Sequence, residues 1–409
     1  MNTLIVNIEL FLETYYISFI YIVSFVVFIC IILLYLWRWR DYLIPCRIAK
    51  KSKQPKVDVT ECEWPKLSVI VPAFDQAGLL AKNLPLLLEQ DYPNFEVIVV
   101  DEASTDDTSA IVKQMQLRYR NLRCTFVPST ADICKRKLAI TLGVRAARSE
   151  WAVITTASAF PRSQKWLKHM ASQIDEECDV ILGYASYINE GSPYSYRAIY
   201  ERLFMQLRCY RSALGLGSIG GDETNFCIRK SAFLEHKGYA DKLQNDFGES
   251  HLLIETLAQK NNTRLAICPE ATMVEELPLE LVWKNTRICY RETLMHASKR
   301  TYLYLLREGA ASFLIYLLIF CVLSYISLRG FQIGILKDYN LNFIYLDFLI
   351  LLQVSLTIVI PLMLLRRTTN LLDEPKYGWR FIRYMLLHPF SNLSEKWHRW
   401  KLRKEFCRK

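Results

Sequence analysis

Two short stretches decide the fold of this chain. Residues 68–75 read S-V-I-V-P-A-F-D, and residues 97–108 read V-I-V-V-D-E-A-S-T-D-D-T. Each contains a run of β-branched residues typical of a buried strand. The acidic and small residues that follow predict a tight turn and a helix N-terminus capped by Asp106 or Asp107. Capping does not explain Asp101, so this carboxylate at a strand end is a candidate binding group.

The alternation of strand and helix continues through residues 66–277. It predicts an α/β domain with a mostly parallel, Rossmann-like sheet. Ligands bind such sheets at the carboxyl ends of the strands, so we expect the site in the loops after Val71, Val100 and Thr155. The predicted strands are 67–71, 95–100, 123–127, 151–155, 180–184, 225–228 and 264–267, and the predicted helices lie near 78–90, 107–119, 135–147, 163–176 and 250–260.

Composition narrows the class of protein. The 409 residues are 52% apolar, which excludes a disordered or collagen-like chain. The net charge of +10 comes mainly from Lys and Arg in residues 38–56 and 366–409, outside the α/β region. This placement argues against nucleic acid as a partner. The 12 cysteines form no C-x-x-C pair and resemble a reduced, cytosolic set.

Three apolar runs without charge lie outside the α/β region, at residues 14–37, 310–328 and 348–365. Each is long enough, as a helix, to cross a bilayer, so we expect three transmembrane helices. The Lys and Arg beside them place the N-terminus outside and the α/β region in the cytoplasm. The expected location is a bacterial inner membrane, crossed several times, with the main domain facing the cytoplasm.

These observations predict six segments. In the last of them, Trp379, Phe381, Trp397 and Trp400 lie among cationic residues, which indicates contact with an anionic lipid surface. The segments are an N-terminal transmembrane helix (1–37), a basic juxtamembrane linker (38–65), the α/β domain (66–277), an interfacial helix region (278–309), two transmembrane helices with a short external loop (310–365) and a basic amphipathic cytoplasmic tail (366–409).

The two opening stretches resemble blocks of the family 2 glycosyltransferases. The family patterns are roughly S-V-I-V-P-x-Y-N-E and E-V-I-V-V-D-D-G-S-x-D-x-T, which compare with residues 68–76 and 96–108. Residues 84–95, L-P-L-L-L-E-Q-D-Y-P-N-F, and residues 135–147, which begin K-R-K-L-A, resemble two further blocks. The resemblance covers about residues 66–300. It implies the GT-A fold of nucleotide-diphospho-sugar transferases.

The resemblance also assigns expected roles. Asp101 stands where the family contacts the nucleotide base, Pro72 and Ala73 where it lines the base and ribose site, and Lys137 where it approaches the diphosphate. Glu249, in D-F-G-E-S-H at 246–251, stands where the family has its catalytic base. Asp246 and His251 are alternative bases, and an ordinary acid at a helix N-terminus is an equally good interpretation of Glu249.

Three family motifs are altered. The D-x-D triplet, which binds Mg²⁺ or Mn²⁺ in the family, corresponds to Thr156 and Ser158, whose neutral hydroxyls are weak ligands for a hard cation. Ser250 and His251 replace carboxylates of the base cluster. We therefore assign no metal ligand and no cofactor. In place of Q-x-x-R-H, whose arginine can bind phosphate through two N–H groups, the chain has Glu292, Met295 and His296.

Two further features allow more than one interpretation. Asp222 and Glu223 are paired acids that could recruit a metal in another way. The glycine-rich residues 215–221 fit either a flexible lid or an ordinary surface loop.

Two functions follow as hypotheses. The first is a membrane-bound family 2 glycosyltransferase that transfers a sugar, with inversion, from a nucleotide-sugar to a lipid-linked or envelope glycan acceptor. The second is a catalytically inactive pseudo-glycosyltransferase that acts as a binding or assembly partner in envelope polysaccharide synthesis. The expected partners are a lipid bilayer, a nucleotide-sugar, a lipid-linked acceptor and envelope-assembly proteins.

Overall fold

The computed structural model describes residues 64–128, 133–215, 217–244, 247–310 and 362–378, with a few isolated positions elsewhere. The chain divides into two compact units. One comprises residues 1–42 with 302–365, and the other comprises residues 43–301 with 366–409. The second unit contains the α/β domain.

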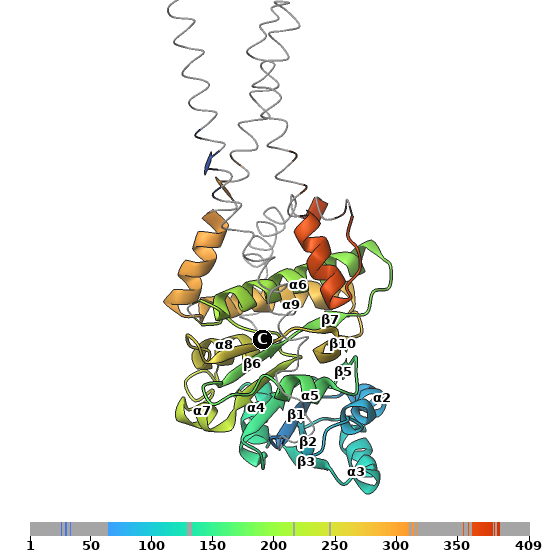
Figure 1. Cartoon of the computed structure of the whole chain (residues 1–409). Helices are drawn as coiled ribbons and strands as arrows, with labels where there is room; N and C mark the ends of the chain where they lie inside the picture. The colour runs from blue at the N-terminus through green and yellow to red at the C-terminus, as the bar shows by residue number, and fades with distance from the viewer. Residues whose placement is uncertain are drawn as a thin grey trace, which may run out of the picture. The chain divides into compact units, whose positions relative to one another are not determined.

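A seven-stranded sheet with the order β3-β2-β1-β4-β8-β6-β9 is the centre of this unit (Figure 1). Four of its strand pairings are parallel, and only the two pairings of β8 are antiparallel. This confirms the predicted α/β class with a mostly parallel sheet, and each of the seven predicted strands is found. They are β1 (Leu67–Ala73), β2 (Phe95–Asp101), β3 (Leu122–Phe126), β4 (Trp151–Ile154), β6 (Val180–Gly183), β8 (Phe226–Arg229) and β9 (Thr263–Ala266).

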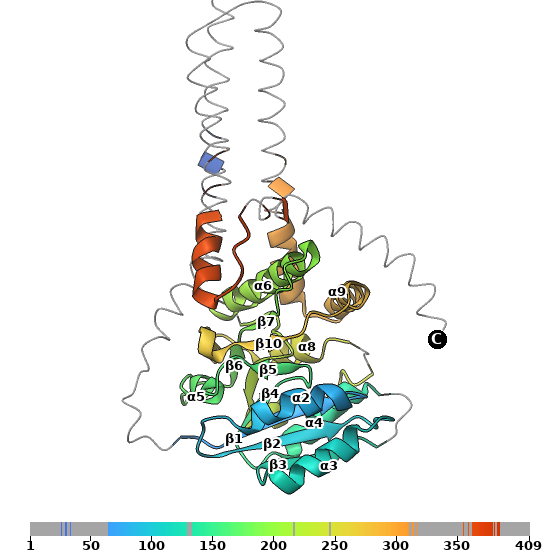
Figure 2. The same ribbon diagram turned by 90° about the vertical axis from the view of Figure 1, so that its right-hand side faces the viewer.

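A second sheet was not predicted. It consists of β5 (Ala159–Pro161), β10 (Met273–Glu275) and β7 (Ala185–Tyr187), in that order. Strands of three residues are too short to show an alternating pattern in the sequence. In Figures 1 and 2 this small sheet lies between α6 (Pro193–Ala213) and the large sheet. In this sheet Glu275 pairs with Ala159, the residue that directly follows the altered D-x-D position.

Helices cover both faces of the large sheet. Gly143 of α4 lies against Ile70 and Val100 on one face, where even one added methyl group would clash with Ile70. Residues of α2, α3 and α5 pack on the other face. The labelled helices are α2 (Ala77–Leu88), α3 (Thr108–Arg118), α4 (Lys135–Ala146), α5 (Trp166–Ala171), α6, α7 (Lys230–Glu235), α8 (Glu249–Leu257) and α9 (Glu280–Met295), with a 3-10 turn η1 (Pro269–Ala271). Residues 299–310 and 362–372 are also helical.

The long helix α6 was missed, although its start is marked in the sequence. Ser192 is the N-cap, its hydroxyl accepts the backbone N–H of Ser195 at 3.0 Å, and Pro193 follows in the first turn. Helices α6 and α9 lie side by side, joined by an ion pair between Glu201 and Arg287 at 2.9 Å. The α9 helix falls within the segment 278–309, where a helical region was expected.

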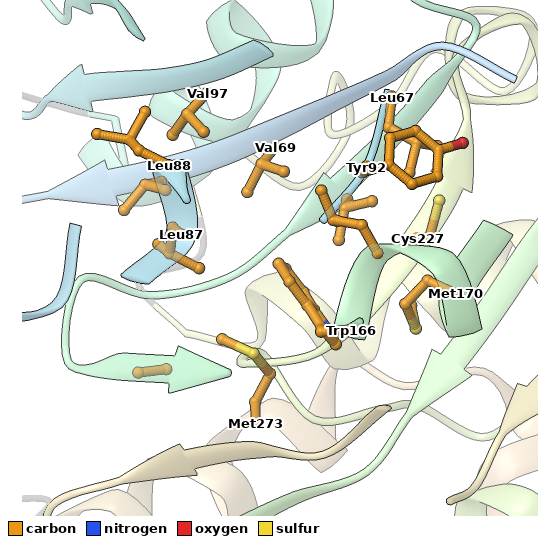
Figure 3. Packing of buried hydrophobic residues seen from close by; sticks show 14 of the residues in the cluster. Leu67, Val69, Leu87, Leu88, Tyr92, Val97, Trp166, Met170, Cys227 and Met273 are labelled. Atoms are coloured by element: carbon orange, nitrogen blue, oxygen red, sulfur yellow. The ribbon is translucent and has the colours of Figure 1, made fainter. Parts of the chain in front are cut away.

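The core on one face of the sheet is built around Trp166. Figure 3 shows its ring among Leu67 and Val69 of β1, Leu87 of α2 and Met273 of the small sheet. The indole N–H donates to the Asn225 side chain at 3.1 Å, which satisfies the polar group of a fully buried ring. This packing fixes the small sheet against the large one.

The expected fold class with three transmembrane helices is wrong. Within the part of the chain that the structure describes, every helix is too short or too polar to cross a membrane. The longest, α6, carries charged residues such as Arg197, Glu201 and Arg202, and α9 has 16 residues. The prediction rested only on the length and the lack of charge of three segments of the sequence. The three segments 14–37, 310–328 and 348–365 lie almost entirely outside the described residues.

Residues 372–377, at the beginning of the expected tail, dock on the α/β domain. The Glu374 carboxylate is buried and accepts the Tyr184 hydroxyl at 2.9 Å. Arg162 donates to the Leu372 carbonyl at 3.2 Å, and the Tyr377 ring packs edge-on against Tyr200 of α6. Burial raises the pKa of Glu374 to about 7, although hydrogen bonds from Ser186 and Tyr184 oppose the shift.

Replacement of Glu374 by Gln should change the pH dependence of stability. A carboxyl with a raised pKa binds its proton more tightly in the folded chain, so the wild-type protein should lose stability as pH rises from about 4.5 to about 7. The full loss is on the order of 3 kcal/mol. The melting temperature of Glu374→Gln relative to wild type should therefore be higher at pH 8 than at pH 5.

The exposed neighbour Asp373 supplies the control. Asp373→Asn should differ from wild type by the same amount at both pH values, since the Asp373 side chain is 81% exposed. A Glu374→Gln difference that stays constant from pH 5 to pH 8 would contradict the assignment.

Candidate functional site

The loops after β1 and β2 are locked together at the carboxyl edge of the sheet. The strands are parallel neighbours in a register that pairs Ala73 with Asp101, so their loops leave side by side. The Asp75 carboxylate accepts the backbone N–H of Thr105 at 2.6 Å, and Asp106 accepts that of Ala77 at 3.0 Å. Asp106 also accepts the N–H of Thr108, so it provides the bond expected of a helix cap.

Asp101 ends β2 and is buried within this loop pair. Its carboxylate accepts the backbone N–H of Ser104 at 2.9 Å and the hydroxyl of Ser109. Burial would raise the pKa of Asp101, but these hydrogen bonds outweigh it and hold the pKa below its usual value. The structure thus brings the predicted residues Pro72, Ala73 and Asp101 together, with an ionised carboxylate. Their role in nucleotide binding stays a prediction.

Ala103, in the loop after β2, has a strained backbone conformation. Ala103 has φ of +63°, in the left-handed region that glycine adopts without cost. The motif that this stretch resembles has glycine at that position. The loop keeps its shape because Ser104 on one side and Asp101 on the other are held by hydrogen bonds.

Ala103→Gly should therefore stabilise the protein. Removal of the Cβ relieves left-handed strain of roughly 1–2 kcal/mol, partly offset by the greater freedom of glycine in the unfolded chain. We expect the free energy of unfolding to rise by about 0.5–1 kcal/mol in denaturant titrations. Ala110→Gly, at an exposed helical position of α3, should instead lower it by about 1 kcal/mol. Equal losses in the two variants would refute strain at Ala103.

Lys137 and its neighbour Arg136 make different contacts in the structure, and the expected role of Lys137 near a diphosphate stays a prediction. Lys137 is fully buried, and its ammonium donates to the carbonyls of Lys242 and Phe247, at 3.0 and 2.9 Å. It therefore holds the segment that leads to α8. Arg136 is the cation at the strand ends, because it donates to the Pro72 carbonyl and to Glu102, both at 2.9 Å. The K-R-K run at 135–137 signalled cations here but not which one faces the site.

The altered D-x-D position has gained a carboxylate from another strand. The hydroxyls of Thr156 and Ser158 lie 3.0 Å apart, just after β4. Both reach the same oxygen of Glu275, at 3.0 and 2.7 Å. Because β10 pairs with β5, Glu275 is held next to the position that the two missing acids would occupy. Sequence reasoning missed Glu275, which lies 117 residues from Ser158.

Arg202 of α6 completes this cluster. Its guanidinium binds Asp222 through two N–H groups, at 2.8 and 2.7 Å, and Glu275 at 2.7 Å. It also lies over the Tyr187 ring, 4.3 Å from the centroid. Burial opposes the charge of both Arg202 and Asp222, but their attraction outweighs it, so the pKa of Asp222 is lowered. Loss of one partner from such a buried pair typically costs about 3–5 kcal/mol.

These residues do not fit the Mg²⁺ or Mn²⁺ that the family resemblance implies. A hard divalent cation needs several oxygen ligands with negative charge. The carboxylates of Asp222 and Glu275 are already bonded to Arg202, and Thr156 and Ser158 donate toward Glu275 instead of facing a cation.

Two further carboxylates lie near Arg136. Glu249 begins α8 and accepts the Cys134 thiol at 3.6 Å. Glu223 can be reached by solvent, yet it is densely surrounded by protein. Desolvation of the carboxylate by this protein environment is the main reason that the pKa of Glu223 is raised to about 7. Repulsion from Glu249, Glu275 and Asp222 adds to the rise, and attraction to Arg136 opposes it. Glu223 thus gains or loses a proton near neutral pH.

Of the two alternative bases, His251 and Asp246, the structure describes only His251. His251 is half-buried, its ring lies 4.8 Å from that of Tyr290, and burial lowers its pKa to about 4. It is therefore uncharged at neutral pH and part of the packing. Asp246 lies outside the described residues. Within the glycine-rich segment, residues 217–221 are buried, so this part is not an ordinary surface loop.

The counterpart of Q-x-x-R-H lies at the end of α9. Glu292 and Met295 are on the helix, and His296 follows it as the C-cap; Met295 and His296 are exposed. Nearby Thr293 packs on Gly248, whose φ of +87° and close approach both require glycine. This contact brings α9 to the turn that carries Glu249. A role for these three residues stays a prediction.

Comparison with known proteins identifies the domain. Residues 68–236 match the model of "Glycosyl transferase family 2". A GalNAc(5)-diNAcBac-PP-undecaprenol beta-1,3-glucosyltransferase of Campylobacter jejuni is 46% identical over 52 residues, which cover 13% of this chain and 17% of the relative. A dolichyl N-acetyl-alpha-D-glucosaminyl phosphate 3-beta-D-2,3-diacetamido-2,3-dideoxy-beta-D-glucuronosyltransferase of Methanococcus voltae is 30% identical over 107 residues. These residues cover 25% of this chain and 32% of the relative.

Among solved structures, a mannosyltransferase of Pyrobaculum calidifontis in complex with GDP-Man and Mn²⁺ superposes with a TM-score of 0.47 and 17% identity, over 81% of this chain and 98% of that one. The two curated relatives are matched over less than a third of their own lengths. The family match itself spans β1 to the end of α7, the part of the fold that holds Asp101, Thr156 and Arg202. Over residues 68–236, the chain matches glycosyl transferase family 2.

Proposed function

We propose that this protein is a glycosyltransferase that takes its sugar from a nucleotide-sugar bound at the carboxyl edge of β1, β2 and β4. The observation that carries the proposal is the ionised Asp101 carboxylate, fixed beside Pro72 and Ala73 by the two interlocked loops. Such a carboxylate can accept hydrogen bonds from a base N–H or a ribose hydroxyl. The match to the family 2 model supports this assignment.

The transfer requires a base for the acceptor hydroxyl. As the hydroxyl oxygen attacks the anomeric carbon, it gives up its proton, and the nucleoside diphosphate leaves with the bonding electrons. A carboxylate whose pKa lies near the working pH suits this step. Glu223, with a pKa of about 7, has this property, and the acid expected from the motif is Glu249. We propose Glu223 as the base and Glu249 as its acidic neighbour.

The relatives' names support a proposal for the acceptor class. One is named for an undecaprenol diphosphate-linked glycan, one for a dolichyl phosphate-linked sugar and one for poly(ribitol-phosphate). We extend this to a lipid-linked or envelope glycan acceptor here. Contact with a bilayer, envelope-assembly partners and a location at the cytoplasmic membrane stay predictions.

The second candidate function is a pseudo-glycosyltransferase that binds but does not transfer. The observation in its favour is the cluster of Arg202, Asp222 and Glu275, which fills the place of the family's metal ligands with a closed ion-pair network. Binding and turnover therefore need separate tests.

Nucleotide binding tests the site itself. Titration calorimetry of the full chain against UDP, GDP, ADP and CDP should show binding of at least one. Asp101→Asn should weaken it by about tenfold or more, equivalent to about 1.4 kcal/mol, because the amide cannot supply the negative charge. Asp107→Asn, an exposed acid at the start of α3 with no side-chain cap bond, should leave affinity unchanged. Absence of binding by all four nucleotides would overturn the assignment.

Turnover separates the two functions. Release of nucleoside diphosphate from a panel of nucleotide-sugars, with a polyprenol-linked acceptor, should occur in wild type and fall by about 10²–10⁴-fold in kcat in Glu223→Gln. Wild-type kcat should rise with pH through about 7, as the carboxylate loses its proton. Glu276→Gln, at an exposed pair with Lys82, is the control. Nucleotide binding without turnover of any donor would instead favour the pseudo-glycosyltransferase.

A further inference from the structure

One buried cluster gathers polar side chains from four segments that are distant in the sequence. Thr156 and Ser158 follow β4, Arg202 lies on α6, Asp222 precedes β8 and Glu275 ends β10. Their side chains are connected without a break, from the two hydroxyls to Glu275, from Glu275 to Arg202, and from Arg202 to Asp222. The side chains of Arg202, Asp222 and Glu275 are 7%, 5% and 13% exposed.

The guanidinium of Arg202 is fully used within this cluster. Its Nε donates to Asp222, its Nη2 to Asp222 and to the Thr224 hydroxyl, and its Nη1 to Glu275 and to the Ser186 carbonyl. A guanidinium has five N–H donors, and these contacts occupy all of them. The planar fork matches the Asp222 carboxylate through two parallel bonds, a geometry that lysine cannot reproduce.

We infer that Arg202 replaces the divalent cation: a fixed guanidinium holds Asp222 and Glu275, so the site binds no metal of its own. The inference rests on the proposed function, which places the donor at the end of β4. A metal would have to displace a guanidinium that is bound by two carboxylates. The altered D-x-D position and Arg202 act on the same carboxylate, because the hydroxyls of Thr156 and Ser158 and the guanidinium all donate to Glu275.

Removal of Arg202 should uncover a metal site. In Arg202→Ala, the carboxylates of Asp222 and Glu275 face each other without a cation, beside the hydroxyls of Thr156 and Ser158. This is a set of oxygen ligands with two negative charges, which suits Mn²⁺. We expect Mn²⁺ to bind the full-length variant at least tenfold more tightly than wild type, measured as loss of the free-Mn²⁺ signal in electron paramagnetic resonance. Mn²⁺ at about 1 mM should also raise the melting temperature of the variant but not of wild type.

Two variants make the test specific. Arg202→Gln keeps an N–H donor and much of the side-chain volume, so it serves if Arg202→Ala does not fold. Arg197→Ala removes a half-exposed arginine from the same helix, paired with Glu201, and should not gain Mn²⁺ binding. His169, Cys268 and Glu270 form another group that could hold a metal ion. Its sulfur and nitrogen ligands favour zinc, so Mn²⁺, which prefers oxygen ligands, is the appropriate probe for the cluster around Arg202.

The Mn²⁺ measurements test the inference without any nucleotide or sugar. Tight Mn²⁺ binding by wild type that is lost in Glu275→Gln would overturn it, as would a folded Arg202 variant that binds Mn²⁺ no better than wild type. Gain of binding in Arg202→Ala or Arg202→Gln, and not in Arg197→Ala, would support it. Since no substrate is present, failure of the proposed transferase activity would leave this result interpretable.

Discussion

The parallel pairing of β1 with β2 and β4 is the constraint on which the site depends. All seven residues of β1 are buried, so a change of register would disrupt close packing on both faces of the sheet. That register sets Ala73 beside Asp101 and Ile70 beside Ile154. Three loops therefore leave the sheet at one edge, and the polar residues that follow the strands meet there.

The strands and most helices of the α/β domain could be predicted because their signals are local. A run such as V-I-V-V and a turn such as S-T-D-D lie within a few residues of each other. The same holds for Asp101, whose environment consists of its own loop and the neighbouring one. Features that depend on long-range contacts could not be predicted: the three-residue strands of the small sheet and the partnership of Ser158 with Glu275.

The membrane prediction failed for a different reason. It was drawn from length and lack of charge, properties that describe a segment in isolation. The described helices owe their form to contacts with the sheet, as α6 shows: most of one face is buried, and its charged residues Arg202 and Glu201 pair with other elements. Runs of apolar, β-branched residues showed where strands lie, whereas no comparable pattern indicated that Arg202 would occupy the middle of a polar cluster.

The docked residues 372–377 also have a consequence for the order in which the chain becomes complete. Tyr184 directly follows β6 and has a buried hydroxyl, and Glu374, which accepts its hydrogen bond, is 190 residues further along. During synthesis the sheet can form long before this acceptor leaves the ribosome. Until then the Tyr184 hydroxyl must rely on water, and the surface of α6 around Tyr200 stays uncovered. The nascent domain would therefore expose aromatic surface until residues 372–377 are made, and chaperones could bind it during that interval.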